Sequence, residues 1–143
     1  MAEVKYESKI TSSQASAADI YRVLSDLRNL DRVKNLIPED RVQEMEFGQD
    51  YARFKVDGLG QKICIRIVDK EDNKTVKFGA ENLPLEANFW IQLKEIAPAD
   101  TRIRLTFKGD MPIMFKMIIG QKMQQGLDQA ADMLAAMPYS EWV

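Results

Sequence analysis

The chain has 143 residues, of which 45% are hydrophobic and 29% are charged. These values are average for a globular domain and exclude a disordered or fibrous chain, and the length suits a single domain over residues 1–143. The formal net charge of −2 argues against attraction of the whole protein to nucleic acid, although it permits a local basic patch.

Histidine is absent, which excludes mechanisms that need a histidine base, dyad or metal ligand. The single cysteine, Cys64, can form neither an internal disulfide nor a cysteine-rich zinc site. The amino terminus lacks a signal-peptide region, and the longest apolar stretch, residues 113–120, contains Lys116 and is too short to span a bilayer. We therefore expect a cytoplasmic protein with no membrane span and no cofactor.

The first predicted element is a half-buried strand over residues 4–12, in which charged residues alternate with apolar or small ones. One face of this strand carries Val4, Tyr6, Ser8 and Ile10.

Two helices are predicted next. Ser16 and Asp19 fit a capping box at the start of the first helix. The apolar residues at helical spacing that follow are Ile20, Val23, Leu24 and Leu27. A second short helix begins at about Asn29 and ends before Pro38. Its buried residues are predicted to be Leu30, Val33 and Leu36.

Between residues 41 and 109 the hydrophobic period changes from that of a helix to that of a strand. Clear alternation runs over residues 51–56, 62–67, 76–80, 87–93 and 103–107. A sixth strand at 41–47 is the least clear, because Val42 and Met45 fall on opposite parities. Short connections with turn residues separate these runs, which predicts an antiparallel meander of six strands with one apolar face.

The last predicted element is a helix over about residues 113–136, preceded by Pro112 and ended by Pro138. Its length of about 36 Å is enough to cross the whole sheet. Steps of three and four relate the members of its apolar stripe, which are Phe115, Ile119, Met123, Leu127, Ala130, Leu134 and Met137. The tail, residues 138–143, either folds back onto the body, contacts a second subunit in a homodimer, or is disordered.

The order strand, two short helices, six antiparallel strands and long helix resembles the helix-grip fold of the START-like superfamily, also called SRPBCC. The resemblance covers about residues 3–137. It depends on the opening KYESKITSSQASAADIYRVLSDLRNLDRV and on the closing helix MPIMFKMIIGQKMQQGLDQAADML. It implies an α+β fold in which a curved sheet of about seven strands wraps around the carboxy-terminal helix, often with a hydrophobic pocket between them.

The resemblance leaves the function open. Members bind lipids, hormones, quinones or polyketide intermediates, a minority catalyse reactions, and others activate a heat-shock chaperone or bind ribosomes. The superfamily has no shared catalytic motif, so no catalytic residue is transferred to this chain, and the fold alone does not choose among these functions.

The predicted ligand site is the apolar parity of the sheet together with the facing helix. Aromatic and methionine side chains are suitable walls for an apolar ligand, although the same side chains could also fill the space as a solid core. The candidate ligand-binding residues are Phe54, Val56, Ile63, Ile65, Phe78, Phe89, Ile91, Leu105, Phe107, Phe115, Ile119 and Met123.

Two glycines interrupt the last helix. Gly126 lies beside the apolar stripe, where glycine costs roughly 1 kcal/mol relative to alanine. We expect it to let the helix approach the sheet closely, or alternatively to leave room for a ligand. Gly120 lies away from the stripe, and the sequence suggests no role for it.

Polar candidates for catalysis on the inner parity are few. Tyr6 and Ser8 share that parity, and a tyrosine hydroxyl could donate to a ligand carbonyl. Glu44 and Glu46 share a strand face about 7 Å apart, although solvated surface carboxylates explain them more simply. Cys64 has no histidine to activate it and is interpreted as a packing residue.

The outward parity of the sheet is predicted to be basic. It carries Arg53, Lys55, Lys62, Arg66, Lys77, Lys94, Arg102 and Arg104, together with Lys5 and Lys9 from the first strand. The clear acids on this parity are Glu7, Glu81 and Glu86, and the aromatic residues are Tyr51 and Trp90. Such a face either binds an acidic protein or RNA or is simply solvated.

The sequence thus favours a non-catalytic protein that binds a small apolar or amphipathic molecule, such as a lipid, quinone or polyketide. An interaction protein that uses the basic face and a cyclase- or hydratase-like enzyme are the alternatives. A small apolar ligand is the expected partner, nucleic acid is not favoured, and a homodimer stays open.

Overall fold

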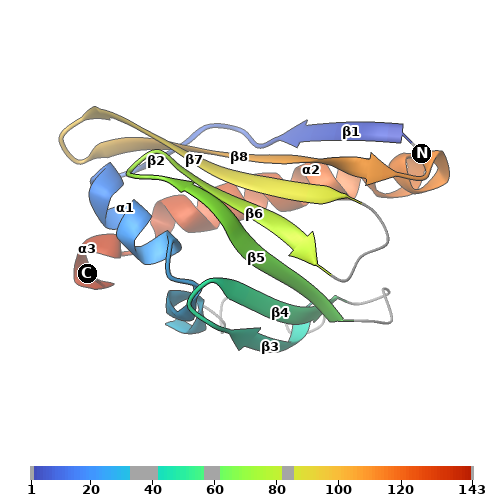
Figure 1. Ribbon diagram of the computed structural model, residues 1–143. Helices are drawn as coiled ribbons and strands as arrows, with labels where there is room; N and C mark the ends of the chain where they lie inside the picture. The colour runs from blue at the N-terminus through green and yellow to red at the C-terminus, as the bar shows by residue number, and fades with distance from the viewer. Residues whose placement is uncertain (1, 33–41, 57–61, 82–85, 143) are drawn as a thin grey trace.

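An eight-stranded antiparallel sheet curves around one long helix in the computed structural model (Figure 1). The structure describes residues 2–32, 42–56, 62–81 and 86–142. Within these ranges, the side chains that it leaves out are those of Ala2, Val42, Gln43, Val56, Phe115, Ile118 and Ile119. The architecture is the α+β helix-grip arrangement that the order of predicted elements indicates.

The elements follow the predicted order along the chain. The strands are β1 (Ala2–Glu7), β2 (Thr11–Ser13), β3 (Val42–Phe47), β4 (Tyr51–Val56), β5 (Lys62–Glu71), β6 (Thr75–Glu81), β7 (Ala87–Ala97) and β8 (Asp100–Met111). The helices are α1 (Ala17–Leu24), the 3-10 helix η1 (Leu27–Arg32), α2 (Ile113–Ala136) and α3 (Tyr139–Trp142).

The strand order across the sheet is β1-β8-β7-β6-β5-β4-β3, and β2 also pairs with β8. Strands β3 to β8 are therefore neighbours in sequence and in space, which confirms the predicted six-strand meander. In the turn between β5 and β6, Asn73 has a φ of 61°. Asparagine tolerates this left-handed backbone, so the turn suits the residue that occupies it.

The first predicted strand is in fact two strands, and the prediction is wrong for Ile10. The backbone N–H of Ser8 donates to the Leu105 carbonyl at 2.8 Å, and the Leu105 N–H donates to Ser8 Oγ at 2.9 Å. The next backbone N–H, of Lys9, donates to the Asp128 carboxylate on α2 at 2.7 Å. The chain leaves the β8 ladder here, and Ile10 is 61% exposed instead of inward-facing.

Strand β3 contains a β-bulge. Its pairing with β4 shifts between Gln43 and Glu46, and Glu44 has a φ of 52°. A bulge places one extra residue in a strand and so changes the parity of the residues on either side. This explains why Val42 and Met45 do not share one parity in the sequence.

Helix α1 begins as predicted. The Ser16 hydroxyl accepts a hydrogen bond from the backbone N–H of Asp19 at 3.2 Å, which satisfies one of the free donors of the first turn. The second predicted helix corresponds to η1, which starts at Leu27, two residues earlier than expected. Val33 and Leu36, which the prediction buries in this helix, lie outside the described residues.

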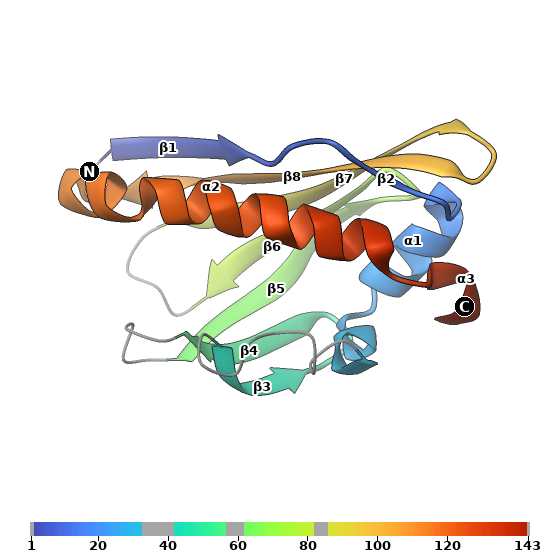
Figure 2. The same ribbon diagram turned by 180° about the vertical axis from the view of Figure 1, so that it is seen from behind.

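Helix α2 has the predicted bounds and runs along the sheet beside β1 and β8 (Figure 2). Pro112 is its N-cap and therefore precedes the first turn. The buried alanine of its inner face is Ala131, whereas Ala130 is only half-buried. Within the described residues, no helix combines the length and apolar character that a membrane crossing requires.

The tail folds back onto the body, which is the first of the three predicted alternatives. Tyr139 in α3 is fully buried, and its ring meets the Trp142 ring edge-on with centroids 6.3 Å apart. The Arg32 guanidinium at the end of η1 lies 5.6 Å from the centre of the Trp142 ring. These contacts tie α3 to the segment that follows α1.

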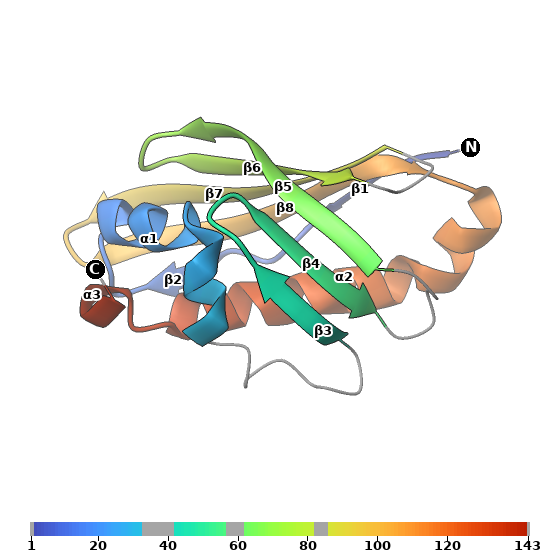
Figure 3. The ribbon, with the colours of Figure 1, turned by 60° about the horizontal axis from the view of Figure 1, so that its bottom comes forward.

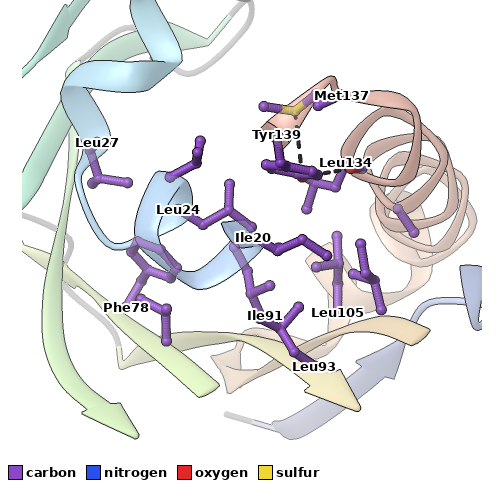
Figure 4. Packing of buried hydrophobic residues seen from close by; sticks show 14 of the residues in the cluster. Ile20, Leu24, Leu27, Phe78, Ile91, Leu93, Leu105, Leu134, Met137 and Tyr139 are labelled. Atoms are coloured by element: carbon purple, nitrogen blue, oxygen red, sulfur yellow. Dashed lines mark hydrogen bonds between the residues drawn. The ribbon is translucent and has the colours of Figure 1, made fainter. Parts of the chain in front are cut away.

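The cluster of buried hydrophobic side chains, which we call the dry core, lies at one end of the sheet. Figure 3 shows α1 and η1 at this end, and Figure 4 shows Ile20, Leu24 and Leu27 within the buried cluster. Across from them lie Phe78, Ile91, Leu93, Leu105, Leu134, Met137 and Tyr139 (Figure 4). The core therefore joins α1, the sheet, the carboxy-terminal half of α2 and α3.

Candidate functional site

The candidate ligand-binding residues of the sheet lie together on its inner face. Residues opposite one another in an antiparallel pair project from the same face. The register pairs Phe54 with Ile63, Ala52 with Ile65, Phe78 with Phe89, Phe89 with Phe107, and Ile91 with Leu105. The candidates Val56, Phe115 and Ile119 have side chains outside the described part of the structure.

Burial changes along these strands. Phe78, Ile91 and Leu105 are buried in the dry core beneath α1. Farther from α1, on β7 and β8 and also on β4 and β5, the inner-face side chains are only half-buried, and these are Phe54, Ile63, Ile65, Phe89 and Phe107. We call this second group the half-buried aromatic face, since it contains three phenylalanines. Phe89 and Phe107 are direct partners across β7 and β8, and Phe54 lies two strands beyond β6, on β4.

Helix α2 shows the same change along its length. Leu127, Ala131 and Leu134 are buried, whereas Met123 is half-buried. At its amino-terminal end the large apolar residues Ile113, Met114 and Met117 are exposed. The half-buried aromatic face and the less-buried half of α2 therefore belong to the same end of the molecule, away from α1 (Figure 2).

Polar contacts attach only one half of α2 to the β1–β2 edge among the described residues. Gln124 Nε2 donates to the Glu7 carbonyl at 2.7 Å, and Thr11 Oγ1 donates to the Ala131 carbonyl at 3.1 Å. Lys9 also forms a 2.8 Å ion pair with Asp132, and this hydrogen bond raises the pKa of Lys9. All of these contacts come from residue 124 onward, which is the half of the helix over the dry core.

Tyr6 stands beside the half-buried aromatic face. Its ring lies 6.5 Å from the ring of Phe107, its partner across the β1–β8 ladder. A Cβ atom added at Gly120 of α2 would lie 3.2 Å from the Tyr6 hydroxyl. Gly120 therefore faces the sheet, and its missing side chain makes room for this hydroxyl.

Gly126 does not have the predicted role. No atom lies within 4 Å of a Cβ built at this position, and the residue is exposed. The expectation of close approach to the sheet is therefore wrong for Gly126. The close approach occurs at Gly120, to which the sequence suggested no role.

The other polar candidates are engaged elsewhere. Ser8 Oγ accepts from the Leu105 N–H and donates to the Lys9 carbonyl at 2.8 Å. Glu44 lies within the bulge of β3, Glu46 follows it, and both are exposed. Cys64 is buried, as expected of a packing residue. Within the described residues, no cluster of three or more metal-ligating side chains occurs.

The outward face is less basic than predicted, because carboxylates pair with its arginines. These ion pairs join Arg53 to Glu46, Arg66 to Asp50 and Glu81, Arg102 to Asp100, and Arg104 to Glu7. The hydrogen bond with Glu81 raises the pKa of Arg66. Glu3, which was not among the predicted acids, lies 3.3 Å from Lys108 on this face. Lys9, which was predicted here, instead pairs with Asp132 on α2.

The outward face still presents an aromatic side chain beside a cation. The Lys77 ammonium lies 5.2 Å from the centre of the Trp90 ring. A hollow of about 360 Å³ beside them is lined by Glu3, Lys77, Glu86, Asn88, Trp90, Lys108, Gly109 and Asp110. Its mixture of acids and bases does not match a polyanion such as RNA, which requires an excess of cations.

No family model matches the chain, and no curated protein matches it either. Solved structures do match. Norcoclaurine synthase from Thalictrum flavum superposes with a TM-score of 0.72 over 94% of this chain and 91% of its own, at 13% identity. The same synthase has also been solved in complex with dopamine and hydroxybenzaldehyde.

Two bacterial structures are also similar. A START superfamily protein from Mycobacterium smegmatis has a TM-score of 0.56 over 85% of this chain and 88% of its own, at 13% identity. A protein from Thermobifida fusca, solved by NMR, has a TM-score of 0.65 over 99% of this chain and 95% of its own, at 12% identity. At these identities the likeness concerns the fold alone, and the chain has the helix-grip fold of norcoclaurine synthase and the START superfamily protein.

Proposed function

We propose that the chain binds a small apolar or amphipathic molecule, such as a lipid, quinone or polyketide, between the half-buried aromatic face and α2, and releases it unchanged. The observation that carries this proposal is the partial burial of Phe54, Phe89 and Phe107 on the inner face of the sheet. Protein interiors pack densely around such side chains when nothing else is to be accommodated. Apolar walls with few polar groups are also the usual lining of a small-molecule site.

The remaining candidates complete this site. Ile63, Ile65 and Met123 are also half-buried and extend the apolar wall toward β5 and α2. Phe78, Ile91 and Leu105 form its floor where it meets the dry core. Val56, Phe115 and Ile119 are proposed to line it on the basis of their sequence positions. Affinity would come from burial, at about 25 cal/mol per Å² of apolar area before the ordering costs are subtracted.

The fold likeness supports a ligand-binding role, since norcoclaurine synthase of the same fold binds dopamine and hydroxybenzaldehyde in its own structure. The same likeness keeps the enzyme alternative open for testing. The outward-face alternative receives less support, because its arginines already have carboxylate partners.

The test is to fill the proposed site. N-phenyl-1-naphthylamine is titrated into the wild-type protein and into Phe89→Trp and Met123→Trp, with probe fluorescence as the measurement. The larger side chains are expected to weaken binding at least about tenfold, because they occupy the volume that the probe needs. Asn88→Trp on the outward parity of the same strand and Gln125→Trp on the exposed side of α2 are the matched controls and should bind as the wild type does.

Two results would contradict the proposal. One is a wild-type protein that does not bind the probe, and the other is unchanged affinity in a folded Phe89→Trp protein. Mass spectrometry of ligands released from the protein after purification from its host's cells tests the enzyme alternative. A single recovered compound that is unchanged on re-incubation supports a carrier, whereas its conversion to another mass would establish catalysis.

A further inference from the structure

We infer that the Tyr6 hydroxyl is the hydrogen-bond donor of the ligand site, and that the ligand therefore carries a carbonyl or carboxylate oxygen on an apolar body. This inference rests on the proposed function, and it adds the one polar feature by which the site would select its ligand.

The first observation is the position of Tyr6. The ring lies beside that of Phe107, tilted by 33° to it, on the inner face of β1 and next to the half-buried aromatic face. The hydroxyl reaches toward α2, where it lies 3.2 Å from the position that a Cβ atom would occupy at Gly120. Gly120 precedes Leu127 by about two helical turns, so it lies on the side of α2 that faces the sheet.

The second observation is that this hydroxyl has no hydrogen-bond partner among the described residues. It forms no hydrogen bond with any described residue, while every buried side-chain nitrogen or oxygen in the described part of the chain has one. The Tyr6 oxygen is therefore not sealed in the core, and solvent or a ligand can reach it. A phenolic hydroxyl has one proton to donate, so an acceptor oxygen is the complementary ligand group.

The third observation is that the other polar groups on the inner face are already satisfied. Ser8 is bonded to Leu105 and Lys9. Thr101 Oγ1 donates to the Ala15 carbonyl at 2.8 Å. Among these described inner-face side chains, the Tyr6 hydroxyl is thus the group that can still donate a hydrogen bond to a ligand.

Gly120 preserves the space that this donor needs. A methyl group at this position would lie 3.2 Å from the Tyr6 oxygen, which is a tight contact that pushes the hydroxyl away. Alanine would otherwise be the better helix residue, by up to about 1 kcal/mol. Gly126, with nothing within 4 Å of its Cβ position, provides the matched control for the same substitution in the same helix.

The experiment compares two probes that have the same number of non-hydrogen atoms. 2-Acetylnaphthalene carries a carbonyl oxygen, and 2-isopropylnaphthalene replaces that oxygen with a methyl group. Each is used to displace N-phenyl-1-naphthylamine from the wild-type protein, Tyr6→Phe, Gly120→Ala and Gly126→Ala. Thermal unfolding of each variant confirms that it is folded.

Tyr6→Phe is expected to weaken the ketone about fivefold while changing the hydrocarbon less than about twofold, because one neutral hydrogen bond is lost. Gly120→Ala should reproduce this selective loss, and Gly126→Ala should bind both probes as the wild type does. The Tyr6 assignment alone is overturned if the wild type binds both probes and Tyr6→Phe changes neither, or changes both equally. If the wild type binds neither probe, the proposed function fails, and this inference fails with it.

Discussion

At the scale of single residues, Tyr139 is the largest fully buried side chain among the described residues and has a defined partner. Its hydroxyl donates to the Leu134 carbonyl at 2.5 Å (Figure 4). Leu134 belongs to the last turn of α2, where carbonyl groups have no partner within the helix. Tyr139 therefore satisfies one of these carbonyls and at the same time fixes α3 against the dry core.

Tyr139→Phe should lower the free energy of unfolding by about 1–2 kcal/mol, because the Leu134 carbonyl is left buried without that partner. The measurement is urea denaturation followed by circular dichroism. Tyr21→Phe is the control, since its hydroxyl donates to Asp72 at an exposed site, and a change within about 0.5 kcal/mol is expected there. Equal effects in the two variants would show that the Tyr139 hydrogen bond contributes nothing specific.

The difference in stability between the wild type and Tyr139→Phe should shrink at alkaline pH. Burial raises the pKa of Tyr139 above its usual value of about 10. Below that value the phenol is protonated in both states, whereas above it the unfolded chain loses the proton first. The wild-type advantage over Tyr139→Phe should then shrink by up to about 1.36 kcal/mol per pH unit above pH 10. A constant difference between about pH 7 and pH 11 would contradict this.

At the scale of elements, the orientation of α2 decides which of its two glycines faces the sheet. With about 100° per residue, Gly120, Ala131 and Leu134 all lie within about 40° of Leu127, whereas Gly126 is about 100° away. The apolar stripe read from the sequence advances by repeated steps of four at its start, from Phe115 onward. The stripe located the buried side correctly at Leu127, Leu134 and Met137. Steps of four drift around the helix, however, so the stripe passed Gly120 by.

Gly126→Ala should stabilise the protein by up to about 1 kcal/mol, because it removes a mid-helix glycine without introducing a clash. Thermal and urea unfolding are the measurements. Gly120→Ala gains the same helix propensity but places its methyl group against Tyr6, so its stability should fall below that of Gly126→Ala. Equal stabilisation by both substitutions would mean that the contact with Tyr6 has no energetic weight.

The sequence pattern predicted most of the strands and helices from local signals. In the strands, apolar residues alternate so that one face is buried, and the predicted helices have capping or stop residues at their ends. Ser16 at the start of α1 and the bounds of α2 are examples. The failures have long-range causes. Ile10 turns outward because Asp128, far away in the chain, holds the preceding residue. The Tyr6–Gly120 contact and the carboxylates beside the outer arginines depend on which strands and helices become neighbours, and a local pattern does not encode this.

At the scale of the whole molecule, the fold has two ends with different packing. One end is the dry core formed by α1, α3 and the later half of α2, where polar contacts from residue 124 onward hold the helix to the sheet edge. The other end combines the half-buried aromatic face with an amino-terminal half of α2 that exposes Ile113, Met114 and Met117. A well-buried end thus adjoins a more exposed end, and the proposed ligand would bind at the more exposed one.

This asymmetry predicts a gradient of hydrogen exchange along a single helix. Segments with few buried contacts open locally at lower free energy than the core does. In the ligand-free protein, the free energy of opening should therefore be lower for the amides of residues 117–123 than for those of 127–134. Exchange mass spectrometry should show this as faster hydrogen exchange over 117–123. A bound molecule adds contacts at the less-packed end only, so N-phenyl-1-naphthylamine should slow exchange over 117–123 in the wild type and should not in Phe89→Trp. Uniform protection along α2 would contradict the two-ended packing, whereas a gradient that the probe leaves unchanged would place its binding elsewhere.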